Sequence, residues 1–135
     1  FHFLLNSDKM VEFNSKTIQI RDEGKLIAVA YFDEGQQVIM GNMNFYHPDY
    51  KKYSLGKYLM LLKIDYAQSK NMDYYYTGYI ALENTKFDYK LFPDMHSIEV
   101  LIKQKENTWL PFSSVEKEGL KELAGFWANM NGDFV

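Results

Sequence analysis

Residues 45–59 constrain the possible folds more than any other part of the 135-residue chain. A strand ending at Tyr46 is interrupted by Pro48, and a Ser-Leu-Gly step at Ser54 then begins an amphipathic helix. When a helix joins two strands of one sheet, the strands run parallel through a right-handed crossover. The next strand, near Tyr74, is therefore predicted to lie parallel to the strand before Pro48.

Alternating apolar residues and turn residues predict the other elements. Asp-Glu-Gly turns separate the first three strands, which are typical of an antiparallel meander. The predicted elements are strands at 17–21, 25–32, 37–46, 73–80, 97–103 and 108–112, one or two helical turns within 81–90, and helices at 55–70 and 115–130. This order predicts an α/β (α+β) fold of the GNAT-like acyltransferase type, a mixed and mostly antiparallel sheet flanked by helices.

The central helix is amphipathic, and its start is a candidate anion site. Apolar residues recur at Leu55, Leu59 and Leu62, and Ser54 is the expected side-chain N-cap. The first turn of a helix presents unpaired N–H groups and the positive end of the helix dipole, which suit a phosphate. Gly56 permits close approach and Lys57 adds a cation. An ordinary helix start after a Pro-Asp turn is the alternative interpretation.

Composition limits the class of protein. The chain is predicted to form one domain over residues 1–135, with no cysteine for disulfides, thiolate metal sites or nucleophiles. Its three histidines lack metal-ligand spacing, and no apolar run is long enough to span a membrane. A net charge of −3 counts against a dedicated nucleic-acid binder, although local basic patches still matter. We expect a cytoplasmic, metal-free protein and, because the chain begins with Phe1, part of something longer.

Three segments together resemble the C-terminal catalytic domain of arginyl-tRNA–protein transferases, over roughly residues 18–112. The first is the strand 25–32, and the second is Tyr-His-Pro-Asp at 46–49 followed by Ser-Leu-Gly-Lys-Tyr at 54–58. The third is Tyr-Tyr-Tyr-Thr-Gly-Tyr-Ile at 74–80, followed by Lys-Phe-Asp-Tyr-Lys at 86–90. His47 departs from the usual Asp of the family pattern, and Phe87 departs from the usual Met.

The resemblance implies aminoacyl transfer on a GNAT-like fold. A charged tRNA would donate Arg or Leu to the N-terminal α-amine of an acceptor protein beginning with Asp or Glu, a tag of the N-degron pathway. It implies aminoacyl-tRNA as a co-substrate, no cofactor, and no covalent enzyme intermediate. The family's cysteine-bearing N-terminal module is absent from this sequence.

Candidate site residues fall into three groups. The donor group is Ser54, Leu55, Gly56, Lys57 and Tyr58; the candidate catalytic residues are Tyr76, Tyr79 and Glu83; and the candidates for binding the acceptor or phosphate are Lys52, Lys86, Tyr89 and Lys90. Phenols on the 73–80 strand can donate hydrogen bonds and stack on bases, and cations can pair with phosphate or with an acidic acceptor side chain. Asp88 and His47 are further possible proton acceptors, and Lys51, Lys52, Lys57 and Lys63 are predicted to form a basic surface around the central helix.

Two other functions remain open at this point. An acetyl-CoA enzyme would favour a basic or amide residue three positions before Gly56 and a small residue two positions after it. Tyr53 and Tyr58 occupy those positions, and a bulky Tyr58 would crowd a pyrophosphate, so coenzyme A is the less favoured ligand. A non-catalytic domain that binds a protein N-terminus or RNA is the third hypothesis.

Overall fold

The computed structural model describes residues 2–7, 14–80, 85–102 and 108–115. The chain divides into two compact units, residues 1–79 and 80–135. The first unit contains β1 (His2–Ser7), β2 (Asn14–Asp22), β3 (Lys25–Glu34), β4 (Val38–Tyr46), the 3₁₀ helix η1 (Pro48–Tyr53), α1 (Leu55–Ser69) and β5 (Tyr74–Tyr76). The second contains the 3₁₀ helices η2 (Thr85–Leu91), η3 (Met95–Ser97) and η5 (Phe112–Ser114), and the strands β6 (Glu99–Ile102) and β7 (Thr108–Pro111).

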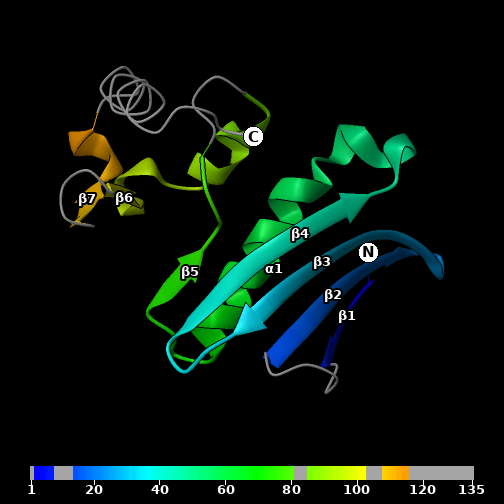
Figure 1. Ribbon diagram of the computed structural model, residues 1–135. Helices are drawn as coiled ribbons and strands as arrows, with labels where there is room; N and C mark the ends of the chain where they lie inside the picture. Colours follow the sequence, from blue (N-terminus) through cyan, green and yellow to red (C-terminus); the bar gives the residue numbers. More distant parts are fainter. Residues whose placement is uncertain (1, 8–13, 81–84, 103–107, 116–135) are drawn as a thin grey trace, which may run out of the picture. The chain divides into compact units, whose positions relative to one another are not determined.

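The five strands of the first unit form one sheet in the order β1-β2-β3-β4-β5 (Figure 1). The first four are antiparallel to their neighbours, and β5 pairs parallel to β4 through residues 38–40 and 74–76. The predicted parallel crossover through α1 is therefore confirmed. The described fold is a mixed α/β arrangement with a mostly antiparallel sheet, as expected.

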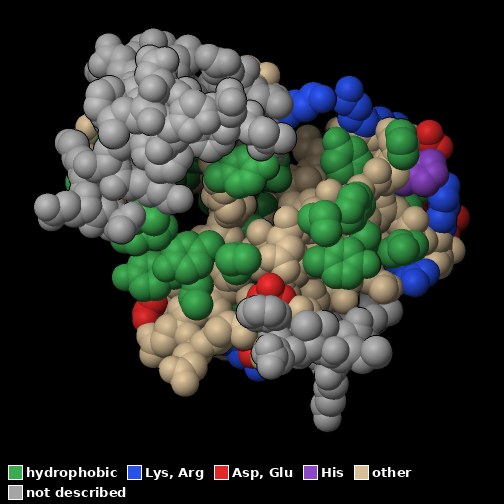
Figure 2. Space-filling view, viewed as in Figure 1, with side chains coloured by type: hydrophobic (Ala, Val, Ile, Leu, Met, Phe, Trp, Pro, Cys, Tyr) green, Lys and Arg blue, Asp and Glu red, His purple; other side chains and the backbone are tan. Residues whose placement is uncertain are grey.

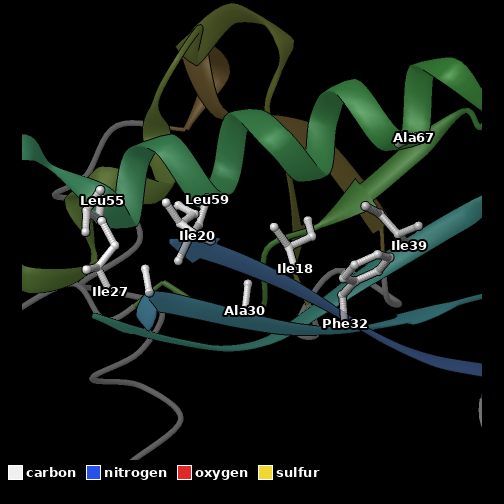
Figure 3. Close-up of a cluster of buried hydrophobic side chains, with 10 residues drawn as sticks. Ile18, Ile20, Ile27, Ala30, Phe32, Ile39, Leu55, Leu59 and Ala67 are labelled. Atoms are coloured by element: carbon white, nitrogen blue, oxygen red, sulfur yellow. The ribbon is translucent and has the colours of Figure 1, made fainter. Parts of the chain in front are cut away.

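The core of this unit lies between α1 and one face of the sheet (Figure 3). Leu55 and Leu59 from α1 are at most 1% exposed, and they pack with Ile20, Ile27 and Phe32 from β2 and β3. Since each fully buried aliphatic or aromatic side chain contributes about 1.5–3 kcal/mol, this layer supplies much of the stability of the unit.

The opposite face of the sheet carries exposed apolar side chains, which Figure 2 shows on the face in view. Tyr31 pairs with Met43, and Phe45 lies two residues further along β4, so the three side chains share one face. Their side chains are 43%, 57% and 52% exposed.

Several predicted boundaries are wrong. The strand predicted at 73–80 ends at Tyr76, since Gly78 has a φ of 87° that an extended strand does not accommodate. Neither β1 nor η1 was predicted. The helix predicted at 115–130 lies outside the described residues after Val115, and within 81–90 the described part is the 3₁₀ helix η2. In the described part of the chain, no helix has both the length and the apolar character needed to cross a membrane.

Candidate functional site

Local hydrogen bonds at both ends of η1 carry the chain from β4 into α1. At the first end, His47 Nδ1 accepts a hydrogen bond from the Asp49 N–H at 3.3 Å. At the other end, the Ser54 N–H donates to the Lys51 carbonyl at 3.2 Å. His47 therefore caps η1.

Ser54 precedes α1, but its side chain does not cap the helix as predicted. Its backbone is left-handed, with a φ of 52°, whereas a capping hydroxyl reaches the first turn from an extended backbone. The Ser54 carbonyl instead accepts hydrogen bonds from the N–H groups of Lys57 at 2.9 Å and Tyr58 at 3.2 Å. A left-handed serine is strained, and such strain is common at binding sites.

The first turn of α1 has the features of an anion site. The N–H groups of Leu55 and Gly56 belong to the first turn of the helix, where no carbonyl of the same helix can accept from them. The first turn also contains no acidic residue that would repel an anion. A Cβ built on Gly56 would lie 4.0 Å from Tyr46 Cε1, which is an ordinary contact distance, so this turn is not crowded by the rest of the fold. The Leu55 side chain is in the core, and only its backbone can therefore serve a ligand.

Tyr58 does not have the environment that the sequence argument assumed. Its ring is half-buried and packs against the core cluster between α1 and the sheet. The argument that Tyr58 would crowd a pyrophosphate is therefore weakened. Tyr53 is 50% exposed, and the Lys52 Nζ lies 5.0 Å from its ring centroid.

The predicted basic surface is only partly present. Lys51, Lys52 and Lys57 are exposed on η1 and the first turn of α1. Figure 2 shows Lys and Arg side chains gathered beyond the C-terminal end of β4. Lys63, by contrast, is 1% exposed, because its position in the helix turns it toward the sheet. Its prediction as a surface cation is wrong.

The tyrosines of β5 lie in two environments. Tyr75 faces α1 and packs against the core cluster. Tyr74 and Tyr76 are exposed and stack in parallel, with ring centroids 6.5 Å apart and planes at 5°. Tyr79 is 75% exposed beyond the end of the strand, so it does not share the Tyr75 face as an extended strand would require.

The remaining predicted residues belong to the second unit. Lys86 is exposed on η2 and Tyr89 is half-buried, whereas Lys90 is only 9% exposed. Burial lowers the pKa of Lys90, because it disfavours the charged form. Glu83 lies outside the described residues.

A buried polar cluster between α1 and β4 was missed by the sequence argument. Lys63 Nζ donates a hydrogen bond to Asn44 Oδ1 at 2.8 Å. A Cβ built on Gly41 would lie 3.2 Å from that Nζ and 3.0 Å from the Tyr75 hydroxyl. The sequence did contain a sign of this burial. Lys63 follows Leu55 and Leu59 at intervals of four residues, which places it on the same buried face of the helix.

A second polar network ties the sheet to the C-terminal half of α1. Lys16 Nζ lies 2.9 Å from Glu34 Oε2 and donates to the Tyr66 hydroxyl at 2.8 Å, and the same hydroxyl donates to Glu34. Burial alone would raise the pKa of Glu34, but the hydrogen bonds from Tyr66 and Lys16 outweigh it and lower that pKa. Burial alone would lower the pKa of Lys16, but its bonds to the same partners raise it. The network therefore holds opposite charges together.

Among the described residues, no three His, Asp or Glu side chains lie close enough together to hold a metal ion. The candidate site is the first turn of α1, which has exposed Lys57 within it and exposed Lys51 and Lys52 just before it.

Comparison with known proteins gives a family match. Residues 1–98 match the family described as "Arginine-tRNA-protein transferase, C terminus". The chain is 37% identical over 87 residues to an aspartate/glutamate leucyltransferase of Pseudomonas entomophila, covering 64% of this chain and 36% of that protein. It is 34% identical over 99 residues to the enzyme of that name from Saccharophagus degradans, covering 73% and 40% respectively.

The arginyl-tRNA–protein transferase 1 of Saccharomyces cerevisiae is 40% identical over 68 residues, which cover 50% of this chain and 14% of that protein. The chain therefore spans well under half the length of the curated relatives it matches.

Proposed function

The chain belongs to the arginine-tRNA-protein transferase C-terminal family, and from this premise we propose that the protein moves an aminoacyl group from a charged tRNA to the N-terminal α-amine of an acceptor protein. The match over residues 1–98 is the observation that carries the proposal. Relatives named as arginyl and as leucyl transferases support Arg or Leu as the transferred residue. The name "aspartate/glutamate leucyltransferase" supports an acceptor that begins with Asp or Glu. A cytoplasmic location belongs to the same proposal.

The reaction is aminolysis of an activated ester. The acceptor nitrogen attacks the ester carbonyl carbon, a C–N bond forms, and the bond to the ribose oxygen of the terminal nucleotide breaks. The proton lost by the amine is transferred to the leaving ribose oxygen. An α-amine has a pKa of about 7.7–8.0, so roughly a tenth of it is neutral at pH 7. The enzyme therefore needs mainly positioning, hydrogen bonds to the oxyanion and a mild proton acceptor.

We assign the donor end of the tRNA to the start of α1. The backbone N–H groups of Leu55 and Gly56 would bind the terminal phosphate, with Lys57 and Lys52 supplying positive charge. The uncrowded position of Gly56, where a Cβ would meet only an ordinary contact with Tyr46, supports this assignment. Ser54 would hold this turn through its carbonyl, and Tyr58 would support it from the core side.

We assign the acceptor and the proton transfers to the aromatic and basic residues further along the chain. Tyr76 and Tyr79 have exposed rings that would stack on a base or donate hydrogen bonds, and Glu83 remains the candidate proton acceptor. Lys86 and Tyr89 are suited to an acidic acceptor side chain, and the burial of Lys90 makes it the less accessible cation. A GNAT-like arrangement of the whole chain is part of this proposal, supported by the parallel β4–β5 pair joined through α1.

The test is transfer by the full-length protein. It is incubated with leucyl-tRNA or arginyl-tRNA and a peptide beginning with Asp or Glu, and mass spectrometry detects a peptide longer by one residue. A peptide with an acetylated N-terminus is the matched control and should not be extended. The absence of extension with both charged tRNAs would overturn the proposal.

The donor site has its own test in Gly56→Trp, with Gly56→Ala as the control. A Cβ at this position meets ordinary contact distances, so the alanine variant should fold, whereas an indole fills the space that the nucleotide needs. We expect the tryptophan variant to lose at least about tenfold in kcat/KM for the charged tRNA, which corresponds to about 1.4 kcal/mol. A folded Gly56→Trp protein with undiminished transfer would contradict the assignment.

A GNAT acetyltransferase that uses acetyl-CoA is the second candidate. The packing of Tyr58 against the core favours it, because the helix start is less crowded than the sequence suggested. Acetylation of the same peptide by acetyl-CoA, without extension by either tRNA, would select this function. Binding of an acidic N-terminus or of RNA with neither reaction would select the non-catalytic hypothesis.

A further inference from the structure

The side of the sheet that faces away from α1 carries exposed apolar side chains on β4 and β5. Ile39 of β4 and Tyr75 of β5 pack into the core on the α1 side. Their neighbours along each strand, Met40, Tyr74 and Tyr76, therefore point to the other side. These three residues are between 41% and 58% exposed.

The same side continues along β4 and onto β3. Asn44 of β4 turns toward α1, where it accepts a hydrogen bond from Lys63. Met43 and Phe45, on either side of it, therefore point away from the helix. Tyr31 of β3 is the cross-strand partner of Met43. We call the whole set the aromatic face, and its members are Tyr31, Met40, Met43, Phe45, Tyr74 and Tyr76.

Little charge accompanies the aromatic face, which Figure 2 shows on the side in view. The strands β4 and β5, which supply five of its six members, contain no charged residue. From β3, Asp33 lies opposite Met40, and its carboxylate already accepts hydrogen bonds from Ser15 and Asn42. RNA binding depends on Lys and Arg that meet phosphates, whereas Tyr, Phe and Met without charge are typical of the centre of a protein–protein interface. The chemistry therefore favours an uncharged, apolar protein surface as the partner.

The size of the aromatic face suits contact between domains. A large apolar side chain has about 200 Å² of surface, so six that are about half exposed offer about 600 Å². Contact with a matching surface would bury about 1,200 Å² in total, within the range of about 600–1,500 Å² for interfaces between domains of one chain. It falls below the total of about 1,600 Å² that is typical of a stable complex between separate proteins.

The relatives contain a large region beyond the part that matches this chain. The matched parts are 36% and 40% of the two leucyltransferases, so more than half of each lies outside the region of similarity. The matching family is the C-terminal part of the transferase. We propose that the aromatic face is a domain interface, which binds an apolar surface of the region that precedes this C-terminal part in a full-length transferase.

Methionine oxidation in the full-length protein tests the interface, because Met40 and Met43 lie within it. Hydrogen peroxide converts an accessible methionine to its sulfoxide, and mass spectrometry of peptides gives the rate at each site, with and without urea. Met95, which is 50% exposed in the second unit, is the matched control, and Met60, which is 1% exposed, is the buried reference. We expect Met40 and Met43 to be oxidised at least about tenfold more slowly than in urea, as a buried methionine is and Met95 is not. Oxidation of Met40 and Met43 at close to their rates in urea would overturn the proposal.

Phe45→Lys adds a charge beside Met43 on the aromatic face and should open the interface. We expect Met43 to be oxidised about tenfold faster than in the wild-type protein, while protection of Met60 shows that the core remains folded. Leu61→Lys, at an exposed position of α1, is the control and should leave the rate at Met43 unchanged. Equal protection of Met43 in both variants would contradict the interface.

A second copy of the chain is the competing occupant. Protection of Met40 and Met43 that disappears on dilution would assign the aromatic face to such a copy and overturn the proposal, whereas contact within one chain does not depend on concentration. The oxidation rates do not depend on tRNA, so the proposed function can fail while the interface is confirmed.

Discussion

At the scale of single residues, Gly41 shows how a missing side chain shapes the interior. The space that its Cβ would occupy is bordered by the Tyr75 hydroxyl and the Lys63 ammonium. The sequence predicted β5 beside β4, but it did not predict that Lys63 of α1 would reach the same point of β4. From the sequence, Gly41 is a glycine within a predicted strand, and such glycines often mark a place where another group approaches the backbone closely.

Gly41→Ala should therefore destabilise the protein. The added methyl group would lie 3.0 Å from the Tyr75 hydroxyl and 3.2 Å from the Lys63 Nζ, which forces both to move. Overpacking of this kind costs about 1–3 kcal/mol in the free energy of unfolding, as measured by urea denaturation. Gly56→Ala, whose Cβ has ordinary spacing, is the matched control and should not lose stability in this way. Equal stabilities for both variants would refute the crowding at Gly41.

At the scale of elements, hydrophobic periodicity predicted α1, β3 and β4 to within a few residues. Periodicity did not predict the length of β5, which depends on its pairing with β4. The strand after α1 is only three residues long, because the chain leaves β4 after Tyr76. Periodicity also missed β1, which pairs antiparallel with β2, the next strand along the chain.

The Lys16–Glu34–Tyr66 network joins β2 and β3 to α1 and predicts a dependence of stability on pH. The folded-state pKa of Glu34 is below its ordinary value of 4.5, so its contribution is present above that value and is lost as the pH falls through the folded pKa. The raised pKa of Lys16 gives a contribution that is lost only as the pH rises beyond 10.5. Neutral pH thus retains both contributions.

Glu34→Gln should reduce the loss of stability on acidification. Between pH 7 and pH 3, we expect the wild-type protein to lose about 1 kcal/mol more in the free energy of unfolding than the variant, measured by urea denaturation at each pH. Asp65→Asn, on the exposed side of α1, is the control and should follow the wild type. The network has no such role if Glu34→Gln has the full acid sensitivity of the wild-type protein.

At the scale of the whole molecule, a net charge of −3 conflicts at first sight with the proposed binding of tRNA. The distribution of charge on the surface resolves the conflict, because the exposed Lys51, Lys52 and Lys57 lie together in η1 and the first turn of α1. A local positive surface is enough to attract phosphate when the remaining charge lies elsewhere.

Lys57→Gln should weaken binding of tRNA and reduce its dependence on salt. Removing one phosphate contact lowers the magnitude of the slope of log K against log salt by about 0.7–1. Fluorescence anisotropy of labelled leucyl-tRNA, measured at salt concentrations from about 50 to about 200 mM, gives this slope. Lys70→Gln, at the other end of the helix, should keep the wild-type slope. If both variants lose equally, the helix start is not the phosphate site.

The sequence by itself determined the order of α1 and of the described strands that follow β1, the parallel pairing across α1, and the family to which the chain belongs. These follow from local periodicity, turn residues and motif order, which need no knowledge of distant contacts. Only the tertiary structure decided that Ser54 turns left-handed, that Tyr58 packs inward and that Lys63 is buried beside Asn44. Those outcomes depend on the rotation of α1 about its axis and on where β4 and β5 separate. Both are set by packing between segments far apart in the chain.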